Sequence, residues 1–144
     1  MQPDPVRLED TRGWLVKAEK DLRSAEHGLS ASPPLLEDVV FHCQQAIEKV
    51  LKGFLAWYDI PFRKTHSLEE IGRQCVNIAP ALKDLVDKAA PLTEYAWKFR
   101  YPGGMEEPTN KDAEEALHIS CEIYNQILAK LPFEARPSSD YRNR

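Results

Sequence analysis

Apolar residues recur at three- and four-residue steps along almost the whole chain, and no segment shows a convincing two-residue alternation. Such steps place apolar side chains on one face of a helix, whereas a half-buried strand needs alternation. The sequence therefore predicts an all-α fold, an up-and-down bundle of four main helices plus one short helix. A chain of 144 residues is long enough to form one domain with its own core.

Capping and helix-breaking residues set the expected helix boundaries. Asp10 is suited to cap the first helix. Ser67 is suited to cap the third helix, in a capping box that Glu70 completes, and Thr109 with Asp112 has the same spacing before the last helix. The expected helical segments are residues 11–29, 36–58, 67–78, 80–99 with a break at Pro91, and 109–130.

The expected domain covers residues 8–131. Residues 132–144 are rich in Pro, Ser and Arg, so a disordered tail is expected there. The helices expected over residues 36–58 and 109–130 have apolar faces wider than a small bundle usually needs. A central place in the bundle would explain such a face, as would a second subunit, and we expect a symmetric homodimer.

Composition narrows the expected partners and compartment. The net charge of −4 argues against a general nucleic-acid-binding surface, although Arg63, Lys64, Lys98 and Arg100 could form a small basic site. The three cysteines form no CxxC pair, which is typical of reduced thiols. Because no apolar run approaches the ~20 residues of a membrane span and the first residues lack the apolar core of a signal peptide, we expect a cytoplasmic protein with no membrane contact.

A narrow polar strip interrupts the second expected helix, which is otherwise apolar nearly all round. The strip consists of Gln45, Glu48, Lys49 and Lys52. Polar groups on a mostly buried helix are costly unless partners satisfy them. The strip therefore marks a polar cleft, an interface or a solvent-facing edge, and Asp21 of the first helix could face it.

Several ordered motifs resemble the HEPN domain family (higher eukaryotes and prokaryotes nucleotide-binding). They are residues 18–22 with Ala25, residues 42–52, Pro61, residues 65–68 and residues 100–103. The resemblance implies a compact helical bundle that is usually dimeric. It also implies a setting in which prokaryotic members are often encoded beside a minimal nucleotidyltransferase, as toxin–antitoxin pairs.

Many members of this family are metal-independent endoribonucleases, whose signature is an Arg followed after four to six residues by a His. No His of this chain has an Arg at that distance before it, and the matching positions after Arg100 hold Met105, Glu106 and Glu107. Cleavage by the ribose 2′-hydroxyl needs a base of near-neutral pKa and a cation beside the phosphate. The leading hypothesis is therefore a non-catalytic binding module that pairs with a nucleotidyltransferase and binds nucleotide or RNA phosphate.

The expected ligand or partner cleft consists of Gln45, Glu48, Lys49, Lys52, Arg100 and Tyr101. The alternative hypothesis is a ribonuclease in which His66 or His42 replaces the missing base beside Arg100. Plainer roles remain open: Arg100 could pair with Glu48, and His66 could bind a loop carbonyl. No metal or cofactor is expected, because the candidate ligands come only in pairs.

Overall fold

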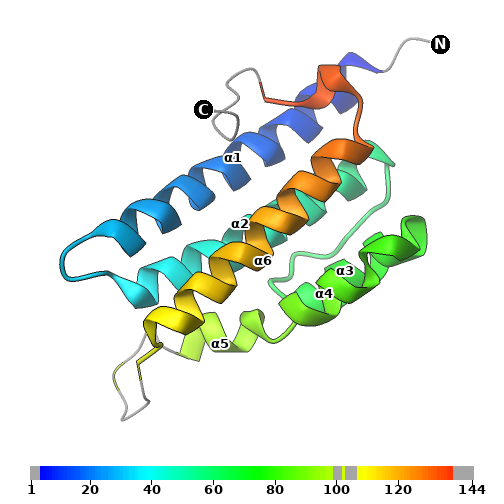
Figure 1. Ribbon diagram of the computed structural model, residues 1–144. Helices are drawn as coiled ribbons and strands as arrows, with labels where there is room; N and C mark the ends of the chain where they lie inside the picture. The colour runs from blue at the N-terminus through cyan, green and yellow to red at the C-terminus, as the bar shows by residue number, and fades with distance from the viewer. Residues whose placement is uncertain (1–3, 99–101, 103–106, 138–144) are drawn as a thin grey trace.

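The computed structural model describes residues 4–98, 102 and 107–137, and the statements below concern those residues alone. Their α-helices are α1 (Pro5–Ser30), α2 (Leu36–Trp57), α3 (Leu68–Ile78), α4 (Lys83–Ala89), α5 (Leu92–Lys98) and α6 (Asn110–Lys130), with short 3₁₀-helices η1 (Pro80–Leu82) and η2 (Phe133–Ala135). No strand occurs among them, so the predicted all-α bundle is confirmed. Figure 1 shows α1, α2 and α6 lying side by side, with α3 and α4 along one flank and α5 at one end.

Helix α2 lies at the centre of the bundle and contacts α1, α3, α5 and α6. Nine of its apolar residues are at most 2% exposed, including Val40, Ile47, Leu51 and Phe54. A helix that is apolar nearly all round is stable where neighbours surround it. Contacts within one chain therefore explain the wide apolar face of α2, and that face gives no support to a second subunit.

Helix α1 begins earlier than the sequence analysis placed it. Asp4, rather than Asp10, is the N-cap, and its Oδ1 accepts a hydrogen bond from the backbone N–H of Val6 at 2.9 Å. Pro5 fits the first helical position because its missing N–H would have no partner there. Asp10 is an exposed residue within the helix.

The breaks and caps further along the chain follow the prediction closely. The hydroxyl of Thr109 accepts from the N–H of Asp112 at 3.0 Å, and the Asp112 carboxylate accepts from the N–H of Thr109 at 2.9 Å, which completes the predicted capping box. Ser67 caps α3, but its box is one-sided because the Glu70 carboxylate binds Arg63 instead. Helix α4 ends just before Pro91 and α5 begins just after it.

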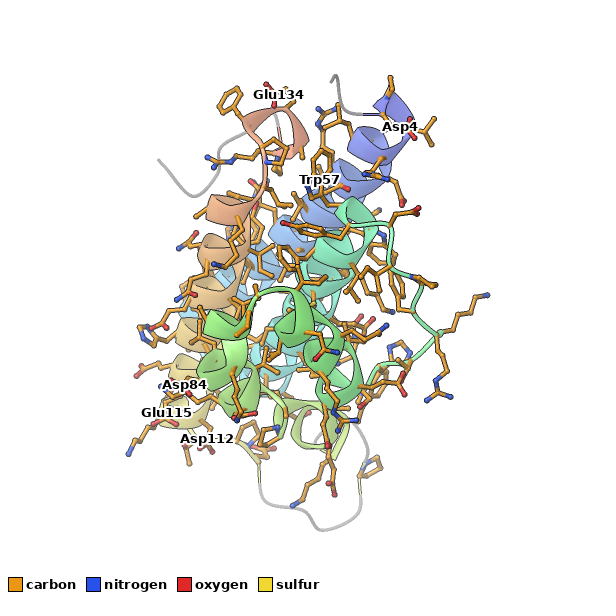
Figure 2. All side chains as sticks on the ribbon, turned by 90° about the vertical axis from the view of Figure 1, so that its right-hand side faces the viewer. Asp4, Trp57, Asp84, Asp112, Glu115 and Glu134 are labelled. Carbon is orange, nitrogen blue, oxygen red and sulfur yellow. The ribbon has the colours of Figure 1, made fainter. Side chains whose placement is uncertain are left out.

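The segment after α6 folds back onto α1 over residues 132–136, where the sequence analysis expected disorder. Ala135 of η2 is fully buried, and the Arg12 guanidinium donates to the backbone carbonyls of Glu134 and Arg136. One buried alanine and two backbone carbonyls leave no recognisable pattern in a sequence rich in Pro and Arg, so this packing could not be predicted. Figure 2 shows Glu134 at the same end of the bundle as Asp4 and Trp57, with Asp84, Asp112 and Glu115 towards the other end.

None of the described helices combines the length and apolar character that crossing a bilayer requires.

Candidate functional site: two carboxylate–histidine pairs

Asp21 of α1 holds two side chains of α2. Its Oδ1 lies 2.8 Å from Nδ1 of His42, and its Oδ2 accepts from Nζ of Lys49 at 2.6 Å. His42 and Lys49 are seven residues apart, about two helical turns, so both side chains reach the same face of α2. Asp21 is 8% exposed, and this buried carboxylate therefore fixes His42 against the bundle.

Glu48 forms a second pair, with His66 of the connection between α2 and α3. Its Oε1 lies 2.8 Å from Nδ1 of His66, and its Oε2 accepts from Nζ of Lys52 at 3.2 Å. Glu48 is 4% exposed and Lys52 is 7% exposed. A buried ion pair is tolerated when further contacts compensate for the lost water, and here Gln44 and His66 provide additional hydrogen-bond partners for Glu48.

The backbone of His66 is held as firmly as its ring. The amide of Gln44 donates to the His66 carbonyl at 3.1 Å and to Glu48 Oε1 at 3.4 Å. The hydroxyl of Thr93 on α5 donates to the same carbonyl at 3.3 Å and accepts from the N–H of Leu68 at 2.9 Å. Helices α2, α3 and α5 together therefore position this imidazole.

Aromatic rings connect the two imidazoles into a row, which runs in the order His42, Phe41, Trp97, His66. The ring centroid of Phe41 lies 5.5 Å from that of His42 and 5.3 Å from that of Trp97, and the rings of both pairs are nearly edge to face. The Trp97 and His66 rings lie 5.7 Å apart with their planes tilted by 52°. The side chain of His42 is 32% exposed and that of His66 is 61% exposed, so both ends of the row reach solvent.

Both lysines of the polar strip are already neutralised. Lys49 pairs with Asp21, and Lys52 pairs with Glu48. The ammonium of Lys52 also lies 5.6 Å from the ring centroid of Trp14 and 5.7 Å from that of Phe62, within range of cation–π attraction. Both ammonium groups are thus paired, and the His42 and His66 rings are the more exposed members of their pairs.

The structure places the predicted cleft residues in two hydrogen-bonded groups. Glu48 and Lys52 contact each other, Lys49 joins Asp21, and Gln45 donates to Gln44 at 2.7 Å. The ring of His66 binds Glu48 rather than a loop carbonyl. Arg100 and Tyr101 lie outside the described residues, so their expected contacts have no place in this geometry.

Three residues of the site escaped the sequence analysis. Gln44 is fully buried. It could have been identified from the sequence because it is a polar residue next to Cys43 on the apolar face of its helix. In the sequence, Phe41 and Trp97 look like ordinary core residues. The number of residues between α2 and α5 does not show that the two rings meet. The row of rings is a product of the tertiary fold.

Each imidazole has one engaged nitrogen and one that its carboxylate leaves available. A carboxylate at Nδ1 fixes the ring orientation and favours the proton on that nitrogen, so Nε2 of a neutral ring accepts a hydrogen bond. In the imidazolium form Nε2 becomes a donor and the ring a cation, which suits a phosphate oxygen. Within the described parts of the chain, no group of three His, Cys, Asp or Glu side chains could hold a metal ion.

The molecule is a small all-α bundle whose central helix α2 contributes one member of each carboxylate–histidine pair. The model of the HEPN domain family matches residues 11–130, and the chain is a member of that family. A relative from Methanocaldococcus jannaschii carries the name "Putative toxin MJ1304". It is 29% identical over 130 residues, which cover 76% of this chain and 85% of that protein. No solved structure matches the chain.

Proposed function

We propose that this HEPN protein is the toxin-side member of a toxin–antitoxin-like pair, and that it binds single-stranded RNA without cleaving it. The RNA lies over the row of His42, Phe41, Trp97 and His66. The observation that carries this proposal is the fixing of both imidazoles by buried carboxylates at the two ends of one aromatic row.

The chemistry of the row suits unpaired nucleotides. Bases without a partner strand stack on aromatic side chains, and stacking is worth about 1–3 kcal/mol per base. Imidazolium groups beside Phe41 and Trp97 would bind the phosphates that flank a stacked base. A local site of this kind is compatible with a net charge of −4, because it needs no broad basic surface.

Binding without cleavage is supported by the missing ribonuclease motif and by the pairing of both lysines of the polar strip. Lys49 and Lys52 are paired with carboxylates, and the sequence lacks the spacing of Arg and His that marks the family's ribonucleases. Phosphate cleavage requires positive charge at the developing transition state as well as a base. Within the polar strip both ammonium groups already have carboxylate partners, which favours binding over catalysis at this part of the site.

The binding proposal is tested by fluorescence anisotropy with a 5′-labelled oligouridine at micromolar protein. We expect Trp97→Ala and His66→Gln each to weaken binding by about tenfold, as loss of one stack or one charge-assisted hydrogen bond would do. His118→Gln is the matched control, since His118 also contacts a carboxylate, that of Glu122, but lies on α6 outside the row. Equal affinity of Trp97→Ala and the wild type would refute the proposal.

The expected partner is a minimal nucleotidyltransferase. The family resemblance supports this partner, and the name of the Methanocaldococcus relative supports a toxin role. Affinity purification of the native protein from its source, followed by mass spectrometry, would identify the partner. Repeated recovery of the protein without any nucleotidyltransferase would count against the pairing and leave the RNA-binding test unaffected.

A ribonuclease is the second candidate, favoured by the same carboxylate–imidazole pairs. A carboxylate at Nδ1 is a common way to orient a general base, and His66 or His42 would then take the 2′-hydroxyl proton while Arg100 stabilises the phosphate. Incubation of RNA with the wild type, Arg100→Ala, His66→Gln and His42→Gln separates the two functions. Cleavage by the wild type that is lost in these variants would replace binding with catalysis; equal background in all four would reject the enzyme.

A further inference from the structure

Gln45 is the uncharged member of the polar strip, and half of its amide has no partner in the protein. Its Nε2 donates to Oε1 of Gln44 at 2.7 Å. Its Oε1 accepts no hydrogen bond from the residues that the structure describes. This oxygen is not among the buried polar atoms that lack a partner in the described chain, and Gln45 is only half-buried, so water or a ligand can reach it.

The neighbours of Gln44 decide which way both amides face. Nε2 of Gln44 donates to the carbonyl of His66 at 3.1 Å and to Oε1 of Glu48 at 3.4 Å. A carbonyl and a carboxylate only accept, so the NH2 group of Gln44 must face them and its oxygen must face Gln45. The NH2 group of Gln45 then faces Gln44, and the Gln45 oxygen faces away. Buried groups therefore fix the orientation of an amide that is open to solvent.

The contacts of Gln44 and Phe41 place this amide beside the aromatic row. Gln45 lies one helical turn after Phe41, so the two side chains share a face of α2. Phe41 packs on Trp97, which packs on His66. The carbonyl of His66 in turn binds Gln44, the hydrogen-bond partner of Gln45. The chain of contacts thus returns to α2 one turn from where it began, with the Gln45 amide at its edge.

We propose that Gln45 reads the base that stacks on the row and selects adenine. Its oxygen is an acceptor, and the second N–H of its NH2 group is a donor. The edge of adenine that carries N6 and N7 offers an amino donor beside a ring acceptor, which matches this pair. On the same edge guanine offers two acceptors, whereas cytosine and uracil each offer a single polar group. The inference rests on the RNA binding proposed above and adds a base preference to it.

Fluorescence anisotropy with three labelled oligouridines tests the preference. They differ in one central nucleoside: adenosine, purine ribonucleoside, which lacks the 6-amino group, or 7-deazaadenosine, which lacks N7. All three carry a purine-sized ring that can stack, so differences between them report hydrogen bonds. We expect each analogue to bind the wild type about fivefold to tenfold more weakly than adenosine, because each leaves one atom of the Gln45 amide without a partner.

Gln45→Met separates base reading from stacking, because it keeps a side chain of similar length and removes both polar atoms. In this variant the three oligomers should bind with dissociation constants within about twofold of one another. Gln126→Met is the matched control, since Gln126 is an exposed residue of α6, and it should keep the wild-type preference. Persistence of the preference in Gln45→Met would overturn the role of Gln45.

The wild type alone distinguishes failure of this inference from failure of RNA binding. Equal affinity for the three oligomers would overturn the base preference and leave RNA binding intact, whereas no binding of any oligomer would refute both. Competition with AMP then separates RNA from a free nucleotide as the source of the adenine. AMP lacks the flanking phosphates and bases, so we expect it to displace the adenosine oligomer only at a concentration at least about a hundredfold higher than an unlabelled oligomer requires. Displacement at similar concentrations would overturn RNA as the ligand.

Discussion

Glu48 satisfies three neighbours with its two carboxylate oxygens: Lys52, His66 and Gln44. Its substitution by Gln would leave the buried ammonium of Lys52 without a counter-charge, and breaking a buried pair costs about 3–5 kcal/mol. We therefore expect Glu48→Gln to lower the free energy of unfolding by roughly 3 kcal/mol, measured by urea denaturation.

Glu69→Gln is the control for that experiment. Glu69 also pairs with a basic residue, Arg73, but its side chain is 73% exposed. Exposed pairs contribute about 0–1 kcal/mol, so this variant should unfold almost as the wild type does. Similar losses in both variants would mean that the Glu48 pair is no better shielded from water than a surface pair.

The cysteines should differ sharply in reactivity. Burial raises the pKa of the Cys43 thiol to about 12, although a hydrogen bond with Ser120 works in the opposite direction, and burial also raises the pKa of Cys75 to about 12. The thiolate is the reactive form, so a thiol reagent at pH 8 should label Cys121 first in the folded protein. Persistence of the fast labelling phase in Cys121→Ser would contradict this order.

The same two thiols make stability depend on alkaline pH. Their pKa is about 12 in the folded state and near the ordinary value of 9.0 in the unfolded state, so between these values the unfolded chain loses protons first. Stability is therefore unaffected by these thiols below pH 9, and it falls above pH 9 by up to about 1.4 kcal/mol per pH unit for each thiol. Urea unfolding at pH 8 and pH 10 should show a smaller decrease in Cys75→Ala than in the wild type.

Single residues also show how far the sequence could predict the site. The contact between Asp21 and the polar strip was foreseen, because both sit on helices whose apolar faces had to meet. The pairing of His66 with Glu48 was missed, since the loop that carries His66 has no periodicity from which its position could be derived. The partner considered for His66 was Arg100, which the family resemblance over residues 100–103 had singled out.

At the scale of elements, Gly72 sets how closely α3 and α4 pack. A Cβ at this position would lie 2.3 Å from Cγ1 of Val86, which is 6% exposed. Overpacking of this kind costs about 1–3 kcal/mol, and we expect Gly72→Ala to destabilise the protein by that amount in thermal or urea unfolding.

A double-mutant cycle identifies the cause of that loss. If the clash with Val86 is responsible, Gly72→Ala/Val86→Ala should lose less stability than the two single variants added together. If the stability losses of the two single variants simply add, shortening Val86 has relieved no clash, and the loss in Gly72→Ala comes from the backbone at Gly72.

The ends of the elements were harder to predict than their existence. Helices α2, α3 and α6 lie close to their expected bounds. For α3 and α6 the reason is a local side-chain cap, Ser67 and Thr109, whereas α2 has no side-chain cap. The early start of α1 rests on the local pair Asp4–Pro5, which apolar spacing does not register. By contrast, η2 depends on Arg12, more than a hundred residues away, which no local pattern reveals.

The contribution of η2 can be measured by truncation. A chain ending at Leu131 loses the buried Ala135 and the two carbonyls that bind Arg12. We expect its free energy of unfolding to be about 1–2 kcal/mol lower than that of a chain ending at Pro137, because apolar burial and hydrogen bonds are lost. Identical unfolding curves for the two chains would show that this segment is only a surface attachment.

At the scale of the whole molecule, the acidic net charge limits how RNA can be bound. With imidazoles at the ends of one ring row as the phosphate contacts, few counterions are released, and the logarithm of affinity should fall with the logarithm of salt with a slope of about −1 to −2. Titrations at several potassium chloride concentrations measure this slope. A slope of about −6 or steeper would require a broad basic surface and would move the binding site away from the row.

The first and last described helices bring Asp4 and Glu134 to one end of the bundle, whereas α5, which carries Trp97, lies at the opposite end (Figures 1 and 2). A tag at either terminus can therefore tether the molecule to a sensor chip or a bead with the ring row facing the flowing solution. The same tether would crowd the end that holds Val6 and Phe133. Immobilised protein is thus the right format for measuring oligonucleotides, and untethered protein the right one for measuring self-association.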